Sequence, residues 1–82
     1  MPGKIKIQPP NQPLTKREIE ILTLVAYGKT RGEISHILRI SEETVKEHVE
    51  RTYRKLNASN KTHAATIALE LGLIAPYQRL KD

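Results

Sequence analysis

The types and spacing of the side chains in residues 41–56 would let one side of a helix form polar contacts with a partner molecule. At helical spacing, Val45, Val49, Thr52 and Leu56 would face inward and leave the rest of the segment exposed. The outward positions would be Glu43, Glu47, Glu50, Arg51 and Arg54, with Thr44, Lys46, His48, Tyr53 and Lys55 on the flanks. Flanking cations and hydroxyls suit phosphate groups, and the outward polar groups suit base edges.

The charges of this segment leave two interpretations open. Residues 41–56 include four basic and four acidic residues, so their net charge is zero. Three acid–base pairs have the (i, i+4) spacing that stabilises a helix by about a few tenths of a kcal/mol each: Glu42–Lys46, Glu47–Arg51 and Glu50–Arg54. Alternatively, Glu47 or Glu50 accepts a hydrogen bond from a cytosine amino group, worth about 1 to 3 kcal/mol of discrimination.

Residue types elsewhere argue against an enzyme or a metal protein. The chain has no cysteine, and its only aspartate is the last residue, Asp82. His36, His48 and His63 fall in different expected helices without a companion ligand nearby in sequence. Ser41 and Ser59 suit cap or turn positions, and no serine has a supporting base and acid. We therefore expect no catalytic residue, no metal and no cofactor.

Length and charge narrow the class of protein further. The 82 residues allow one domain, and 14 Lys and Arg against 9 acidic residues give a net charge of +5. This balance favours a polyanionic partner. The apolar runs are too short for a membrane span or a signal peptide, and the absence of cysteine is natural in a reducing compartment. We expect a cytoplasmic location and no membrane partner.

Capping signals predict the elements that position these side chains. Two T-x-x-E capping boxes, Thr15–Glu18 and Thr30–Glu33, predict helices over 16–27 and 31–38. Ile34, Ile37 and Leu38 would form the buried face of the second helix. Ser41 predicts a third helix over about 42–56, ended by Asn57, and Asn60 predicts a fourth, closed by Gly72. Residues 1–13 would be a flexible arm, 14–75 the domain and 76–82 a loose tail.

Two short helices joined by a three-residue turn are typical of a helix-turn-helix. In addition, residues 14–74 resemble the LuxR/FixJ/GerE-type DNA-binding domain. The resemblance rests on Leu14-Thr15-x-Arg17-Glu18-x-Glu20-x-Leu22, Gly28-x-Thr30-x-x-Glu33-Ile34, Ile40-Ser41-x-x-Thr44-Val45-Lys46-x-His48-Val49, Lys55-Leu56, Ser59-Asn60-x-Thr62-x-Ala64 and Gly72-Leu73-Ile74. Lys61, where the family usually has Arg, and Asn57, where it often has Gly, depart from the pattern.

The resemblance implies an all-α fold of four helices, whose third helix enters the major groove of DNA. It places Lys46, Glu47 and Glu50 nearest the bases and Thr44, His48 and Lys55 nearer the backbone. Arg51 and Arg54 are added from the helical spacing alone. Further backbone contacts are expected from Lys16, Arg17, Thr30 and Arg31.

The fourth helix would carry a small apolar strip away from the core, made of Thr62, Ala65, Thr66 and Leu69. Such a strip can be ordinary scattered exposure or a two-fold dimer contact. Because the fourth helix of the family commonly makes the dimer contact, we expect a weak homodimer.

Taken with the charge, these features predict a sequence-specific duplex DNA-binding transcriptional regulator, or the DNA-binding domain of one. RNA polymerase is a candidate further partner. Two rivals remain: a sigma-factor region-four-like module attached to polymerase, and a protein-interaction domain whose neutral third helix meets another protein.

Overall fold

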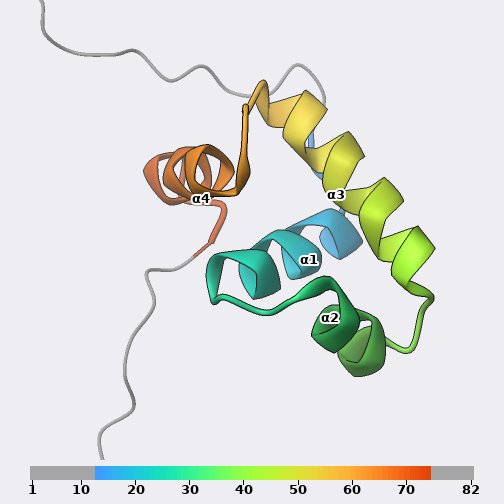
Figure 1. The fold of residues 1–82 in the computed structure, drawn as a ribbon. Helices are drawn as coiled ribbons and strands as arrows, with labels where there is room; N and C mark the ends of the chain where they lie inside the picture. Colours follow the sequence, from blue (N-terminus) through green and yellow to red (C-terminus); the bar gives the residue numbers. More distant parts are fainter. Residues whose placement is uncertain (1–12, 75–82) are drawn as a thin grey trace, which may run out of the picture.

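The computed structural model describes residues 13–74 (Figure 1). Within this range the chain forms four α-helices and no strand: α1 (Lys16–Ala26), α2 (Arg31–Leu38), α3 (Glu42–Leu56) and α4 (Lys61–Glu70). The predicted all-α fold is confirmed, and α1 ends one residue before its predicted limit. The expected arm and tail lie outside the described residues, apart from Pro13.

The first two helices begin at reciprocal capping boxes. In α1, Oγ1 of Thr15 accepts from the backbone N–H of Glu18 at 3.1 Å, and the Glu18 carboxylate accepts from the N–H of Thr15 at 2.9 Å. In α2, Thr30 and Glu33 make the same two contacts at 3.1 and 2.8 Å. Each box satisfies N–H groups that have no partner within the helix. Both predicted boxes are confirmed.

The other two helices begin at single caps. Ser41 Oγ accepts from the N–H of Thr44 at 3.0 Å to start α3, and Asn60 Oδ1 accepts from the N–H of His63 at 2.9 Å to start α4. Asn57 ends α3 with a φ of 58°, the left-handed conformation expected of it.

Arg39 ends α2 in the left-handed conformation, with φ 60° and ψ 45°. Its backbone N–H caps the carbonyl of Ser35, and Ile40 N also bonds to that carbonyl at 3.1 Å. The conformation turns the chain from α2 into α3 within three residues. The residue type did not predict this conformation, because Gly and Asn are the usual residues at such a position.

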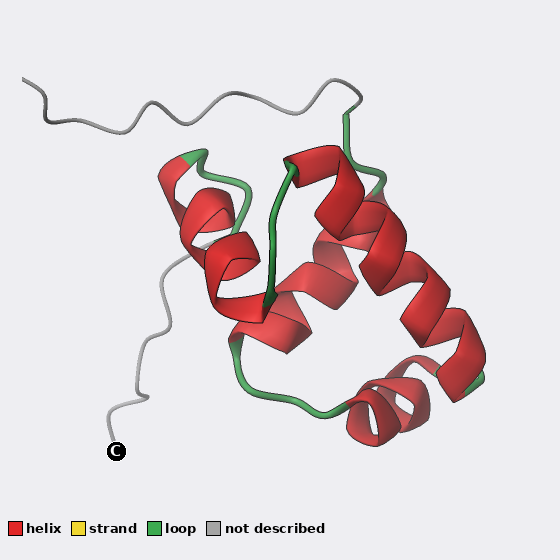
Figure 2. Ribbon diagram, turned by 45° about the horizontal axis from the view of Figure 1, so that its top comes forward, coloured by secondary structure: helices red, strands yellow, loops and turns green. Residues whose placement is uncertain are grey.

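Helix α1 lies at the centre of the described fold and contacts all three other helices (Figures 1 and 2). Its two sides enter separate hydrophobic clusters. One consists of Leu22, Leu56, Ala64, Ile67, Ala68 and Ile74, and joins α1 to α3 and α4. The other consists of Ile21, Val25, Ile34 and Val45, and holds α2 and the start of α3. The position of α3 is therefore fixed at both of its ends.

The prediction that Ile37 belongs to the buried face of α2 is wrong, because this residue is 49% exposed. Only Ile34 is fully buried in this helix, with Leu38 partly buried against the same cluster. The physical reason is that, among the described helices, α2 contacts only α1 and α3. No described element covers the side on which Ile37 lies.

Candidate nucleic-acid interface

Helix α3 has a buried side and an exposed side, as its residue spacing predicts. Val45, Thr52 and Leu56 are buried, and Val49 is partly buried against the α2 cluster. All five predicted outward residues are exposed: Glu43, Glu47, Glu50, Arg51 and Arg54. Lys46 is exposed as well, whereas Thr44 and His48 are half-buried. The exposed side offers a continuous row of polar groups to a partner.

The three (i, i+4) ion pairs expected along α3 do not form. Within residues 13–74, ion pairs of 4.0 Å or less join Arg17 to Glu20, at 3.3 Å, and Glu18 to Arg51 and Lys55. Arg51 is directed to Glu18 on α1 instead of Glu47 on its own helix. The remaining acids of α3 are in solvent, where such pairs gain little.

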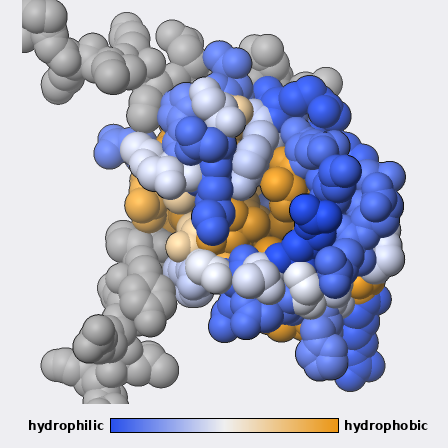
Figure 3. Space-filling model, in the orientation of Figure 1, coloured by the Kyte–Doolittle hydropathy of each residue, from blue (hydrophilic) through white to orange (hydrophobic). Residues whose placement is uncertain are grey.

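A groove of about 340 Å³ runs beside α3, between this helix, the connection from α1 to α2 and the start of α4. It is lined by Val25, Lys29, Thr30, Arg31, Ile34, Val45, Lys46, Val49, Glu50, Tyr53 and Lys61. Figure 3 shows apolar surface in a hollow in the middle of this face, with hydrophilic side chains around it. The groove therefore combines an apolar floor with a polar rim.

The rim is strongly basic: among residues 13–74, its lining has four lysine or arginine side chains and one carboxylate, that of Glu50. Four residues predicted to contact DNA meet here: Thr30, Arg31, Lys46 and Glu50. Lys16 and Arg17 do not line the groove; they lie in the first turn of α1.

Two further basic residues of the groove, Lys29 and Lys61, were not predicted from the sequence as DNA-contacting residues. They come from a turn and from the first residue of α4, far from α3 in sequence. The signals were weak: Lys29 directly precedes the cap residue Thr30, and Lys61 stands where the family usually has Arg.

Tyr53 also lines the groove, and burial raises the pKa of its hydroxyl above the usual value of 10.0. The hydroxyl is therefore protonated at neutral pH and can donate a hydrogen bond.

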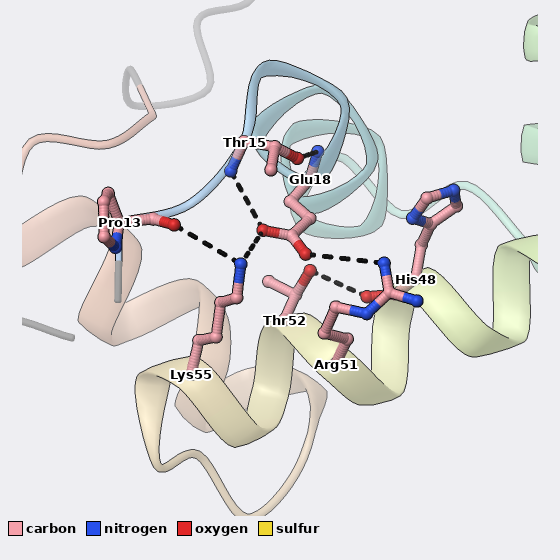
Figure 4. Close-up of polar contacts among 7 residues, drawn as sticks. All are labelled: Pro13, Thr15, Glu18, His48, Arg51, Thr52 and Lys55. Atoms are coloured by element: carbon pink, nitrogen blue, oxygen red, sulfur yellow. Dashed lines mark hydrogen bonds and ion pairs between the residues drawn. The ribbon is translucent and has the colours of Figure 1, made fainter. Parts of the chain in front are cut away.

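Behind α3, the carboxylate of Glu18 is completely buried and ties α1 to α3 (Figure 4). Its Oε1 accepts from Lys55 Nζ at 2.8 Å, and Arg51 Nη1 lies 3.9 Å from its Oε2. Lys55 Nζ also donates to the carbonyl oxygen of Pro13 at 3.3 Å. The side chain of Lys55 is only 14% exposed. This lysine, expected near the DNA backbone, is thus engaged inside the protein.

The pKa of Glu18 reflects opposing effects. Burial raises the pKa, but the hydrogen bonds from Lys55 and from the Thr15 N–H, with the positive charges of Lys55 and Arg51, bring it below its ordinary value of 4.5. The carboxylate is therefore ionised at neutral pH and needs its cationic partners.

The three histidines have separate environments. Nδ1 of His48 is buried without a hydrogen-bond partner, and Nδ1 of His63 accepts from the N–H of Ser59 at 3.0 Å. Across residues 13–74 no cluster of side chains has the makeup of a metal site. None of the helices described there has the length and apolar character needed to cross a membrane.

The predicted strip on α4 faces away from both clusters. Thr62 and Thr66 are exposed, Leu69 is 44% exposed, and Ala65 is half-buried. The strip is therefore accessible on this chain.

Comparison with known proteins identifies this arrangement. The family model described as "Bacterial regulatory proteins, luxR family" matches residues 12–68, more than half of the chain. The chain belongs to the luxR family of bacterial regulatory proteins. The resemblance inferred from the sequence is thereby confirmed, as is the class of regulator rather than enzyme.

Individual luxR-family relatives match over most of this chain. It is 52% identical over 63 residues to the transcriptional activator protein CarR of Pectobacterium carotovorum subsp. carotovorum, covering 77% of this chain and 26% of CarR. It is 47% identical over 68 residues to the regulatory protein SdiA of Escherichia coli K12, covering 83% of this chain and 28% of SdiA. The chain thus spans about a quarter of these relatives.

Solved structures of luxR-type proteins share the fold. The response regulator ChrA of a heme-sensing two-component system superimposes with a TM-score of 0.74 at 43% identity, over 79% of this chain and 32% of ChrA. VqmA of Vibrio cholerae, in a complex with ligand and DNA, gives a TM-score of 0.68 at 29% identity, over 89% of this chain and 30% of VqmA.

Proposed function

We propose that this chain binds duplex DNA sequence-specifically, as a transcriptional regulator or its DNA-binding domain, with α3 in the major groove. Residues 14–75 would be the binding unit, acting in the cytoplasm. The observation that carries the proposal is the exposed polar side of α3 lying directly beside a groove with a basic rim. Membership in the luxR family and the likeness to a DNA-bound relative support it.

The residues divide by distance from the bases in this proposal. Lys46, Glu47 and Glu50 lie nearest the base edges, with Arg51 and Arg54 further along the same side of α3. Thr44 and His48 on α3, Thr30 and Arg31 at the start of α2, and Lys16 and Arg17 on α1 contact phosphates. Lys55 acts through Glu18 by holding α3 in place, because its ammonium group is already bonded there.

We also propose that two copies pair through α4, on a DNA site with two-fold symmetry. The accessible strip of Thr62, Ala65, Thr66 and Leu69 supports this contact. Since the strip is small, DNA that holds two half-sites side by side would supply most of the effective concentration.

The two alternative functions differ from this proposal in the partner that each requires. A sigma-factor region-four-like module acts attached to polymerase, and a protein-interaction domain would use α3 without DNA. RNA polymerase remains a candidate partner for the regulator itself. A mobility-shift titration on genomic fragments without polymerase separates the cases, because only a regulator binds DNA alone.

The decisive test is the salt dependence of binding to a site selected from random duplexes. If each protomer contacts four to six phosphates, a dimer should show a log–log slope of roughly −7 to −11. Lys46→Ala should cost about 1 to 3 kcal/mol if the side chain reaches a base, with Lys81→Ala, outside the described residues, as the comparison. A slope shallower than about −2, or equal affinities of the two folded variants, would contradict the proposal.

A further inference from the structure

Two lysines of the basic groove belong to neither the recognition helix nor the helix before it. Lys29 lies in the connection between α1 and α2, and Lys61 is the first residue of α4. Both are exposed, and neither forms an ion pair within 4.0 Å in residues 13–74. With Arg31 and Lys46 they place four positive charges around the groove, where the described part of the chain supplies one carboxylate, that of Glu50.

The groove lies where a DNA backbone must pass if α3 is inserted. An α-helix with its side chains is about 10 to 12 Å across and the major groove is about 12 Å wide, so an inserted helix has a phosphate backbone on each side. Lys46 and Glu50 belong both to the exposed part of α3 and to the rim of the groove. The backbone on that side therefore comes beside the groove.

We infer that this groove holds the sugar-phosphate backbone of one DNA strand, with Lys29 and Lys61 contacting its phosphates. The inference rests on the proposed function and adds α4 and the connection from α1 to α2 to the DNA-contacting surface. Tyr53 lines the same groove, and its hydroxyl would be a further donor to a phosphate oxygen.

The floor of the groove favours a backbone over a free anion. Its lining includes aliphatic side chains, of which Val49 is partly exposed, and these offer no hydrogen bond to a small ion. A deoxyribose instead presents carbon atoms to such a surface, while its phosphates stay at the basic rim. Since Lys61 directly precedes Thr62, the same short helix would touch DNA and carry the dimer strip.

The test uses the full chain and a duplex with a single half-site, so that one protomer binds. Lys29→Met and Lys61→Met are compared, singly and together, with Lys29→Arg and Lys61→Arg, which keep the charge. Arg39→Asn removes one positive charge away from the groove lining and tolerates the left-handed conformation there. Binding is measured by fluorescence anisotropy from 50 to 200 mM salt, and thermal unfolding verifies that each variant is folded.

Each Met substitution should make the slope of log affinity against log salt shallower by about 0.9. When the salt is raised from 50 to 200 mM, the drop in affinity of the double variant should therefore be about tenfold smaller than that of the wild type. The Arg variants and Arg39→Asn should keep the wild-type slope. A further test uses duplexes in which one phosphate is replaced by a neutral methylphosphonate linkage. Lys61→Met should cause no loss of affinity when that linkage stands at one position, and its usual loss when the linkage stands elsewhere.

The outcomes separate the two proposals. Wild-type binding with an unchanged slope in the folded double Met variant would overturn the inference and leave the proposed function standing. Failure of the wild-type chain to bind any duplex would overturn both.

Discussion

Oε1 of Glu18 accepts a hydrogen bond from Nζ of Lys55 at 2.8 Å, across 37 residues of sequence. The same oxygen accepts from the N–H of Thr15, so one buried carboxylate both starts α1 and holds the C-terminal half of α3. The exposed side of α3 can present its polar groups in a fixed direction only if the helix itself is held. Glu18 is therefore a positioning residue for the recognition surface.

Glu18→Gln should lower the free energy of unfolding by about 2 to 4 kcal/mol. The amide cannot balance the charge of Lys55, whose ammonium is left largely buried without a counter-charge. Urea unfolding followed by circular dichroism measures the change. The control is Glu33→Gln, which alters the same kind of capping box on an exposed helix start and should cost much less. Equal costs would mean that Lys55 contributes nothing.

Acid should weaken the fold through Glu18. Because its pKa in the folded state lies below the ordinary value of 4.5, its contribution is present above that pH and is lost as the pH falls through the folded-state pKa. The free energy of unfolding should therefore decrease as the pH falls below 4.5, and decrease less in Glu18→Gln. Parallel pH profiles for the two proteins would refute this assignment.

Arg39→Gly should stabilise the chain by about 0.5 to 1 kcal/mol. Glycine adopts the left-handed conformation of this residue without the penalty that a Cβ brings, and part of the gain is offset by the greater freedom of glycine in the unfolded chain. Asn57→Gly is the matched control at nearly the same φ, where asparagine already tolerates the conformation. It should gain less, and a larger gain at Asn57 would contradict the explanation.

Glu50→Gln should strengthen binding to all duplexes alike. Glu50 forms no ion pair with Arg54 within 4.0 Å, and of the described residues it is the one carboxylate that lines the basic groove. Removing one charge at roughly 7 Å from a phosphate in water is worth about 0.6 kcal/mol, or about threefold in affinity at low salt. Competition titrations measure the affinities for specific and non-specific duplexes in the same experiment. A loss confined to the best site would show instead that Glu50 reads cytosine.

The free chain should be mostly monomeric at tens of micromolar. The strip on α4 would bury about 300 to 400 Å² per protomer, against about 800 Å² for a stable interface. Sedimentation measures this directly. Leu69→Arg should weaken binding to a two-fold symmetric site and leave half-site affinity nearly unchanged. A tight dimer in solution, or equal loss on both duplexes, would contradict pairing through α4.

Local signals predicted the helices well, because caps and turns depend on residues close in sequence. The boxes at Thr15 and Thr30 and the left-handed Asn57 follow from the side chains present. Arg39 escaped prediction, since its conformation is imposed by the packing of α2 and α3 rather than by its own preference.

Contacts between distant residues could not be read from the same signals. Glu18 looks like a capping residue in the sequence, and its burial against Lys55 requires α1 and α3 to be packed together. The expected Glu47–Arg51 pair fails for the same reason, because Arg51 turns toward Glu18. The basic groove likewise depends on how α4 folds back, which brings Lys61 near α3.

The exposed side of α3 has a consequence for engineering. Glu43, Glu47, Glu50 and Arg54 are exposed and form no ion pair within 4.0 Å in the described part of the chain, whereas Arg51 and Lys55 are tied to Glu18. A combinatorial library restricted to those four positions would leave both hydrophobic clusters untouched. Selection from such a library could redirect the scaffold to chosen promoters at little cost in stability.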